Sequence, residues 1–204
     1  MLFVLCWSLG MAVTCRQIQN ALWLDMWSRH DFVIPNFTPR SWFEADLFAV
    51  TKAGYSHEFE VKLTRADFMR DRAKAHRFGG SYVLGKGWVP HPKTTKHERL
   101  ENGDPAGPCR FTFVVVDGVI GLDECPSWAG LILATVGRRG LGFQTLRHAP
   151  KLHRQKVEPI VMRQAARSFC FRFWDLRRGL KEESNGVDVV DRGSARPAAG
   201  VPVE

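Results

Sequence analysis

The sequence predicts a mixed α/β domain in which helices cover a single sheet. Two features favour this class. Short apolar or alternating segments typical of strands recur along the chain, and segments with helical spacing of apolar residues lie before, between and after them. Hydrophobic residues make up 45% of the 204 residues and charged residues 25%, ordinary values for a soluble protein with a core. Collagen-like, coiled-coil and wholly disordered chains are therefore excluded.

The first third of the chain carries the signals of one helix and three strands. Apolar residues at helical spacing, such as Ile18, Leu22 and Met26, predict a helix at the start. A turn sequence around Gly54 separates two strand-like segments and predicts a hairpin. The expected elements are a helix over 15–29, a strand over 31–35, and strands over 43–50 and 57–63 joined by a turn at 51–54.

The remainder of the domain begins with a helix signal. Thr64 and Asp67 match the capping-box pattern and predict a helix from residue 65 to about 78, ended by Gly79-Gly80. Further on, the apolar sequence FTFVVV is typical of a central strand. The other expected elements are a strand over 82–84, a long basic loop over 85–110, the strand 111–116, a short strand near 143–146 and a helix over 151–178. That last helix is expected to bury Val157, Val161, Ala165, Phe169 and Phe173.

Both ends of the chain differ in composition from the middle. Residues 1–14 form an uncertain apolar leader, which lacks the basic start of a signal peptide and is too short to span a bilayer. Residues 15–181 form the expected domain, and residues 182–204 are expected to be a disordered tail. Five cysteines without a CxxC pair indicate a reducing compartment and no zinc site, so we expect a cytoplasmic location.

Basic residues are concentrated in two blocks. The chain has 29 Lys and Arg against 21 Asp and Glu, a net charge of +8. Residues 62–99 and 147–181 each hold 10 basic side chains, against 3 and 2 acidic ones. Two such blocks favour a polyanionic partner, nucleic acid above all, although a solvated helix face accounts for either block alone.

The predicted hairpin brings charged side chains together. Because side chains alternate along a strand, Glu44 and Asp46 share one face, and Glu58, Glu60 and Lys62 share a face of the partner strand. Carboxylates this close repel one another unless a cation intervenes, and Mg²⁺ is the usual hard cation where phosphate is the substrate. Lys62 is placed to orient or deprotonate a water, or to offset charge on a phosphate. The alternative is a solvent-exposed hairpin face whose alternating charges serve solubility alone.

These residues resemble a known signature. Asp46 and, fourteen residues later, Glu60-Val61-Lys62 resemble the PD-(D/E)XK nuclease signature, an acidic residue on one strand and E-x-K on the next. The segment EADLFAVTKAGYSHEFEVKLTRADF, with Asp71 and Lys74 after it, is similar to the MmcB-like DNA-repair family. The strand FTFVVV and the segment CPSWAGLI are similar to later elements of that family in the same order, and the likeness spans about residues 15–170.

The resemblance implies a fold and a reaction. The fold is a restriction-endonuclease-like core, a mixed sheet flanked by helices. Asp46 and Glu60 would bind Mg²⁺, for which Mn²⁺ would substitute, with the main-chain carbonyl of Val61 as a further ligand and Lys62 as the catalytic lysine. The implied reaction is hydrolysis of DNA phosphodiester bonds without a nucleotide cofactor.

The chain departs from the family's pattern in two places. Ala45 stands where a proline precedes the first acidic residue. The first helix has no glutamate, and its polar residues are Gln17, Gln19, Asn20 and Asp25. A second metal site therefore lacks its usual helix ligand, and Glu44 and Glu58 are the candidates to replace it.

The helix after the hairpin supplies cations for a DNA backbone. Arg65, Arg70, Arg72 and Lys74 would lie near the ends of the strands, where they could contact phosphates. Such contacts read charge and not base identity, so DNA binding is expected to be sequence-independent and sensitive to salt. A solvated helix face explains any one of these residues equally well.

Other residues have plainer interpretations. Asp67 is expected to cap the helix and not to bind metal, and His57 to be structural. Trp88, in the basic loop, is the better candidate for stacking on a base. The tryptophans expected in the core are Trp23, Trp27 and Trp42.

Three functions are open on the sequence alone. The first is a metal-dependent nuclease that acts on DNA in repair or processing. The second is a DNA-binding module on the same fold with a degenerate metal site, which the missing helix glutamate favours and the residues Asp46, Glu60 and Lys62 oppose. The third is a membrane-surface protein that uses the apolar leader. Nothing in residues 40–180 requires it, so we expect DNA and no membrane as partner, and the sequence leaves any protein partner unidentified.

Overall fold

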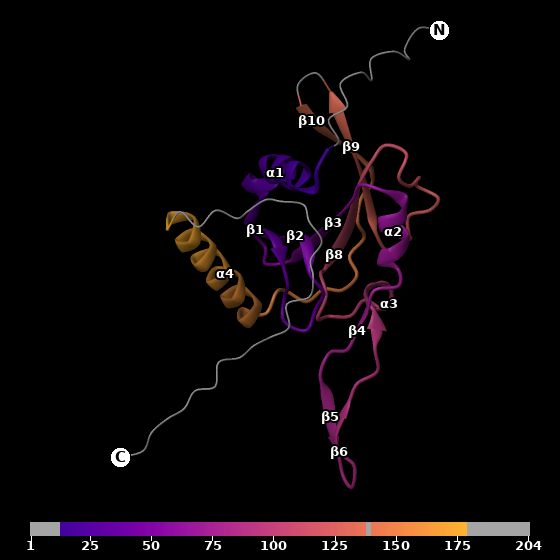
Figure 1. Cartoon of the computed structure of the whole chain (residues 1–204), viewed down its shortest axis with the longest axis vertical. Coiled ribbons are helices and arrows are strands. Elements are labelled where there is room, and N and C mark those ends of the chain that lie inside the picture. The colour runs from indigo at the N-terminus through magenta and orange to yellow at the C-terminus, as the bar shows by residue number, and fades with distance from the viewer. Residues whose placement is uncertain (1–12, 138–139, 179–204) are drawn as a thin grey trace.

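A six-stranded mixed sheet forms the centre of the molecule (Figure 1). The computed structural model describes residues 13–137 and 140–178. In their order across the sheet the strands are β1 (His30–Phe37), β2 (Ala45–Thr51), β3 (Ser56–Lys62), β8 (Arg110–Val116), β9 (Gly130–Gly137) and β10 (Gly140–Arg147). The first three strands are antiparallel, β8 and β9 continue parallel to β3, and β10 turns back antiparallel to β9. The mixed α/β class is confirmed.

The first third of the chain follows the sequence closely. Helix α1 (Cys15–Met26) starts at a capping box of Thr14 and Gln17 and continues into a short 3-10 turn, η1 (Trp27–Arg29). The hairpin of β2 and β3 closes at Gly54, whose φ of +83° suits glycine. Strand β1 runs through Pro35 instead of ending there, because an edge strand tolerates a residue without an N–H.

The middle of the chain differs from the prediction. Helix α2 (Arg65–Asp71) ends seven residues earlier than the predicted residue 78, because Asp71 turns inward to buried ion pairs and the chain then becomes extended. The predicted loop 85–110 also contains regular structure. Its strands are short and at least partly exposed, so no clear pattern in the sequence marks them. The loop contains β6 (Gly87–Pro90), β7 (Thr94–Thr95) and α3 (Lys96–Glu101). Strand β5 (Gly80–Val83) confirms the strand predicted over 82–84, and β4 (Ala75–His76) lies where the helix was expected to continue.

The last third adds a strand and shortens a helix. Strand β9 was not expected, and β10 is longer than the strand predicted near 143–146. Helix α4 (Pro159–Arg177) begins eight residues later than the predicted helix over 151–178, because Pro159 lies in the first turn, where proline favours helix initiation. Its Ala165 is buried as expected, but Phe169 and Phe173 are exposed.

Helices cover both faces of the sheet. Helix α1 packs on the face that carries Phe59 and Val61. On the opposite face, α2 and α3 pack over Phe111 and Phe113, and α4 packs farther along, over β1 and β2. The core prediction is confirmed for Trp42 and wrong for Trp23 and Trp27, which are exposed.

The ends of the chain lie outside the described residues. This applies to residues 1–12 of the expected apolar leader and to the whole expected tail over 182–204. Across the described part of the chain, no helix combines the length and the apolar character needed to cross a membrane.

Candidate active site

The charged residues of the hairpin lie on the face of the sheet that α2 and α3 cover. Phe48 of β2 pairs with Glu58 of β3, and Leu47 pairs with Phe59, so the register brings Asp46 beside Glu60. Side chains alternate along a strand, so Glu58, Glu60 and Lys62 all point to this face. We call Asp46, Glu58, Glu60 and Lys62, together with Asp71 and Lys96, the carboxylate–lysine cluster.

Asp46 is fixed by the backbone of the neighbouring strand. Its Oδ2 accepts a 2.7 Å hydrogen bond from the N–H of Val61. The side-chain amide of Gln19, from α1, donates to the main-chain oxygen of Asp46 at 2.8 Å. Burial, and next the negative charge of Glu60, raise the pKa of Asp46 to about 6. Asp46 is partly exposed, so its carboxylate could hold a cation.

Glu60 is buried and bonded to two lysines. Its Oε1 accepts a hydrogen bond from Lys62 Nζ at 2.9 Å, and its Oε2 accepts one from Lys96 Nζ at 2.7 Å. Lys62 Nζ also lies 3.2 Å from an oxygen of Asp71. Burial opposes the charged form of Lys62, but the charges of Glu60 and Asp71 outweigh it and hold its pKa above the usual value. Lys62 is therefore an ammonium at neutral pH.

Glu58 lies deeper than the rest of the cluster. One oxygen accepts a 2.8 Å hydrogen bond from the indole N–H of Trp42, and the other lies 2.5 Å from Lys96 Nζ. Its exposed fraction is 0%, and burial raises its pKa to about 7 although Lys96 opposes the shift. Glu44, in contrast, is exposed, and only its main-chain oxygen contacts the cluster, at 3.2 Å from Lys96 Nζ.

Asp71 closes the cluster from the end of α2. Its exposed fraction is 1%, and its second oxygen lies 3.3 Å from the ring of His97 on α3. Burial works against ionisation, but the hydrogen bond from His97 and the charges of Lys62 and Lys96 hold the pKa of Asp71 well below its usual range. Asp71 is thus a permanent anion that keeps Lys62 in place.

Sequence reasoning missed two members of the cluster, Lys96 and Asp71, and also His97, which contacts Asp71. Lys96 falls in the segment that was expected to be a loop, and nothing local reveals its partners 36 and 38 residues away. A signal for its helix does exist. Thr95 and Glu98 form a capping box, with Thr95 Oγ1 accepting from the N–H of Glu98 at 3.1 Å.

The donor set of Asp46 and Glu60 fits a hard divalent cation. Carboxylate oxygens are the ligands that Mg²⁺ prefers, and it usually takes one or two of them and keeps waters. Among the described residues, no three His, Cys, Asp or Glu side chains converge as a metal cage. Asp46 and Glu60 could hold one ion, with the Val61 carbonyl as a candidate third ligand, although both oxygens of Glu60 already accept hydrogen bonds from Lys62 and Lys96.

The four predicted phosphate ligands lie in different surroundings. Both terminal nitrogens of the Arg65 guanidinium donate hydrogen bonds to the carboxylate of Glu124, and Nη1 also donates to the main-chain oxygen of Val119. Arg70 is exposed on α2, 3.8 Å from Asp67, and Arg72 is exposed at the C-cap of that helix. Lys74 is exposed just beyond the helix and lies 3.7 Å from Asp71. Three of the four are therefore available to a ligand.

His57 and Asp67 have local contacts. His57 points to the opposite face from the cluster, stacks on Phe59 at 4.0 Å between ring centroids, and shares a 2.7 Å hydrogen bond with Thr112 Oγ1. Burial lowers the pKa of His57 to about 3, so the ring is neutral. Asp67 lies in the first turn of α2, where its N–H donates to Thr64, and its carboxylate is 3.9 Å from Lys62.

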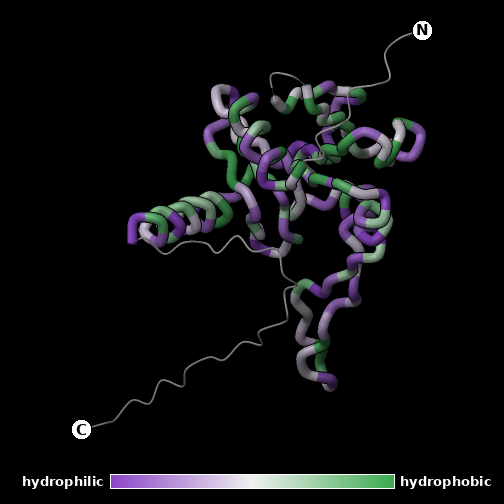
Figure 2. The backbone as a smooth tube through the Cα atoms, turned by 45° about the horizontal axis from the view of Figure 1, so that its top comes forward, coloured by the Kyte–Doolittle hydropathy of each residue, from purple (hydrophilic) through white to green (hydrophobic). Residues whose placement is uncertain are grey.

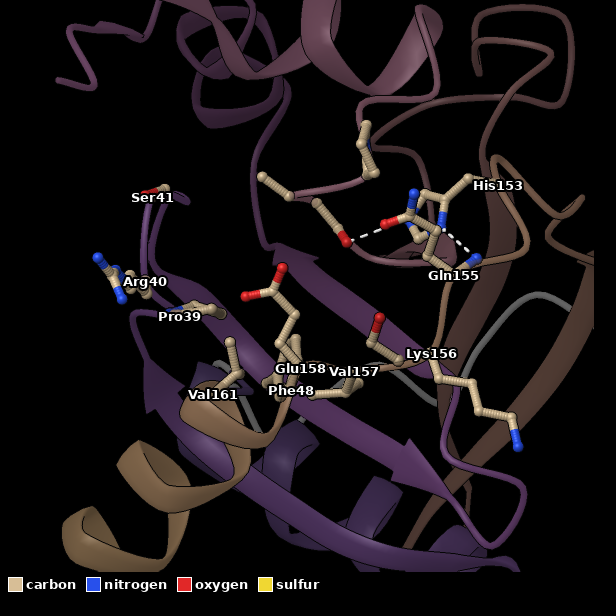
Figure 3. A pocket seen from close by; sticks show the side chains of 14 residues that line it. Pro39, Arg40, Ser41, Phe48, His153, Gln155, Lys156, Val157, Glu158 and Val161 are labelled. Carbon is tan, nitrogen blue, oxygen red and sulfur yellow. Dashed lines mark hydrogen bonds between the residues drawn. The ribbon is translucent and has the colours of Figure 1, made fainter. Parts of the chain in front are cut away.

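A shallow cavity of about 390 Å³ lies elsewhere on the sheet (Figure 3). Arg40, Phe48, His153, Lys156 and Glu158 are among its lining residues. Asp46, Glu60 and Lys62 do not line it. The cavity is therefore separate from the charged cluster and contributes no residue to the candidate active site.

Comparison with known proteins bears on the fold. No family model matches the chain, and no curated protein matches it. Among solved structures the chain is similar to SPO1766, a protein of unknown function from Silicibacter pomeroyi. The two are 17% identical, the match covers 89% of this chain and 100% of that one, and the TM-score is 0.56. At this identity the likeness extends to the fold alone.

Proposed function

We propose that this protein is a metal-dependent nuclease that hydrolyses DNA phosphodiester bonds in repair or processing. One observation carries the proposal. Asp46 accepts a hydrogen bond from Val61 N–H, beside Glu60 and Lys62 on the same face of adjacent strands. The acidic residue and the E-x-K triplet thus lie close together, and this proximity supports the proposal of a PD-(D/E)XK-like site. The mixed sheet with helices on both faces is compatible with a restriction-endonuclease-like core and with the similarity to the MmcB-like family.

Three residues of the cluster have a chemical task in this proposal. Asp46 and Glu60 hold Mg²⁺, which when bound supplies a Lewis acid for the phosphoryl oxygen and lowers the pKa of a water. Asp46 is ionised above about pH 6 and can bind the cation there. Lys62 is held in its charged form, so it orients the water or offsets charge on the phosphate and does not abstract a proton.

A DNA-binding module without turnover is the second candidate. The observation in its favour is Lys96, whose ammonium lies 2.5 Å from Glu58 and 2.7 Å from Glu60. This cation already balances part of the negative charge that a metal would otherwise neutralise. Such a module would bind DNA through the exposed cations of the α2 region and would leave phosphodiester bonds intact.

Substituting Asp46 separates the two candidates. The full chain is incubated with labelled plasmid and with single-stranded DNA in Mg²⁺, and DNA affinity is measured separately in EDTA. We expect Asp46→Asn to lose cleavage at least a hundredfold while its DNA affinity in EDTA stays within twofold of the wild type. The matched control is Asp117→Asn, an exposed aspartate just after β8, which should cleave normally. Cleavage that persists in Asp46→Asn would overturn the proposed site, and binding without cleavage by the wild type would favour the module.

A further inference from the structure

A narrow projection extends from the body of the molecule next to the cluster (Figures 1 and 2). We call residues 75–95 the arm. Its base is the pairing of β4 with β7, and its outer part is the hairpin of β5 and β6. The arm is inserted between two members of the cluster, because Asp71 ends the helix before it and Lys96 begins the helix after it.

The base of the arm is held against the body. Phe78 packs edge-on against Phe43, with 5.0 Å between ring centroids, and the guanidinium of Arg99 lies 4.6 Å from the Phe78 ring. His91 joins the two sides of the arm, since its ring contacts Ser81 Oγ at 2.8 Å and the main-chain oxygen of Phe78 at 3.1 Å. These contacts give the arm a defined direction relative to the cluster.

The arm and its flanks carry positive charge only. No Asp or Glu occurs between Asp71 and Glu98. The exposed cations of this stretch are Arg72, Lys74, Arg77, Lys86 and Lys93. An exposed segment with this charge fits a polyanion and repels a basic partner.

Two aromatic rings lie side by side on the outer hairpin. Tyr82 and Trp88 are cross-strand partners with ring centroids 6.4 Å apart, and their exposed fractions are 82% and 57%. Gly80 makes room for the indole, because a Cβ there would lie 2.7 Å from the Trp88 ring. Exposed rings among phosphate-binding cations are the combination with which proteins bind unpaired nucleic acid, since any base offers a face for stacking.

We propose that the arm binds a single-stranded segment of the nucleic acid, with bases stacked on Tyr82 and Trp88 and phosphates contacted by Arg77, Lys86 and Lys93. Paired bases are stacked inside a duplex and present no face to these rings. The inference rests on the proposed function in one respect. It names the substrate of that same site as DNA with an unpaired segment, which the arm directs toward Asp46 and Glu60.

Fluorescence anisotropy with a labelled oligothymidine and a labelled duplex tests the arm. The full chain is titrated in EDTA, so binding is measured without cleavage. We expect tighter binding of the single strand, and a loss of roughly tenfold or more in its affinity for Trp88→Ala, because stacking on one ring is worth about that factor. Trp88→Phe should retain most of the affinity. Trp174→Ala, an exposed tryptophan on α4, is the matched control and should bind as the wild type does.

The charged residues supply an independent measurement. The logarithm of the binding constant falls linearly with the logarithm of the salt concentration, and each phosphate contact with a single strand adds about 0.7 to the steepness of that fall. We expect Lys86→Gln to reduce the steepness by this amount. Unchanged single-strand affinity in both Trp88→Ala and Tyr82→Ala would overturn the inference, as would equal affinity for the duplex with the same response to Trp88→Ala.

The result is separable from that of the nuclease proposal. Strand binding that depends on Trp88, with no cleavage in any metal, would leave the arm assignment standing and remove the nuclease. Cleavage that depends on Asp46, with binding indifferent to Trp88 and Tyr82, would do the reverse. Binding of neither oligonucleotide would overturn both.

Discussion

Lys96 contacts two buried carboxylates of the cluster, and no single feature of the sequence indicates these contacts. Its exposed fraction is 2%, and its ammonium reaches Glu58, Glu60 and the main-chain oxygen of Glu44. The charges of the carboxylates outweigh the burial and hold its pKa above the usual value. Two buried carboxylates thus depend on one side chain that arrives from a different part of the chain.

Removing this ammonium should destabilise the fold. We expect Lys96→Met to lower the free energy of unfolding by about 3–5 kcal/mol, because it leaves buried carboxylates without their counter-ion. Urea denaturation at pH 8 measures the loss. Lys93→Met removes an exposed lysine three residues earlier and should change the free energy by less than about 0.5 kcal/mol. Equal unfolding midpoints for the two variants would show that the ion pairs of Lys96 contribute nothing to stability.

His57 gives stability a pH dependence of known sign. Its pKa is lowered from 6.5 to about 3 by burial, so between these values the unfolded chain binds more protons at this residue than the folded chain. The free energy of unfolding should therefore fall as the pH drops below 6.5, with a slope of up to about 1.4 kcal/mol per pH unit from this group. His57→Gln cannot titrate and should show a shallower acid decline in urea denaturation between pH 4 and 7. Identical slopes in the two proteins would contradict a buried neutral His57.

At the scale of elements, the sequence predicts what is local. The hairpin of β2 and β3 needs only alternation and a turn at Gly54, and the faces of Asp46, Glu60 and Lys62 follow from the period of a strand. The whole cluster also needs α2 and α3, which pack over the sheet. The arm joins these two helices along the chain. Lys96 and Asp71 therefore become site residues only through tertiary structure.

Other elements were hidden for different physical reasons. Strand β6 is exposed on both sides, so it lacks the apolar alternation that marks a strand on a core. Helix α4 leaves Phe169 and Phe173 exposed, and a periodic apolar pattern does not distinguish a buried stripe from an exposed one. Its start lies later than the apolar periodicity predicts, because Pro159 lies in its first turn.

At the scale of the whole molecule, charge and fold point to the same region. The first basic block, 62–99, contains α2, the arm and most of α3, and α2 and α3 each contribute a residue to the carboxylate–lysine cluster. Positive charge around a group of carboxylates is the arrangement expected where a polyanion is brought to a metal ion. The second basic block includes the whole of α4, which packs over β1 and β2, away from the cluster.

Cleavage of labelled plasmid and single-stranded DNA in Mg²⁺, in Mn²⁺ and in EDTA tests the central proposal most directly. We predict cleavage with either metal and none in EDTA, and loss of cleavage in Lys62→Ala, whose fold is checked by circular dichroism. Cleavage that continues in EDTA, or an equally active and folded Lys62→Ala protein, would contradict a metal-dependent nuclease built on Asp46, Glu60 and Lys62.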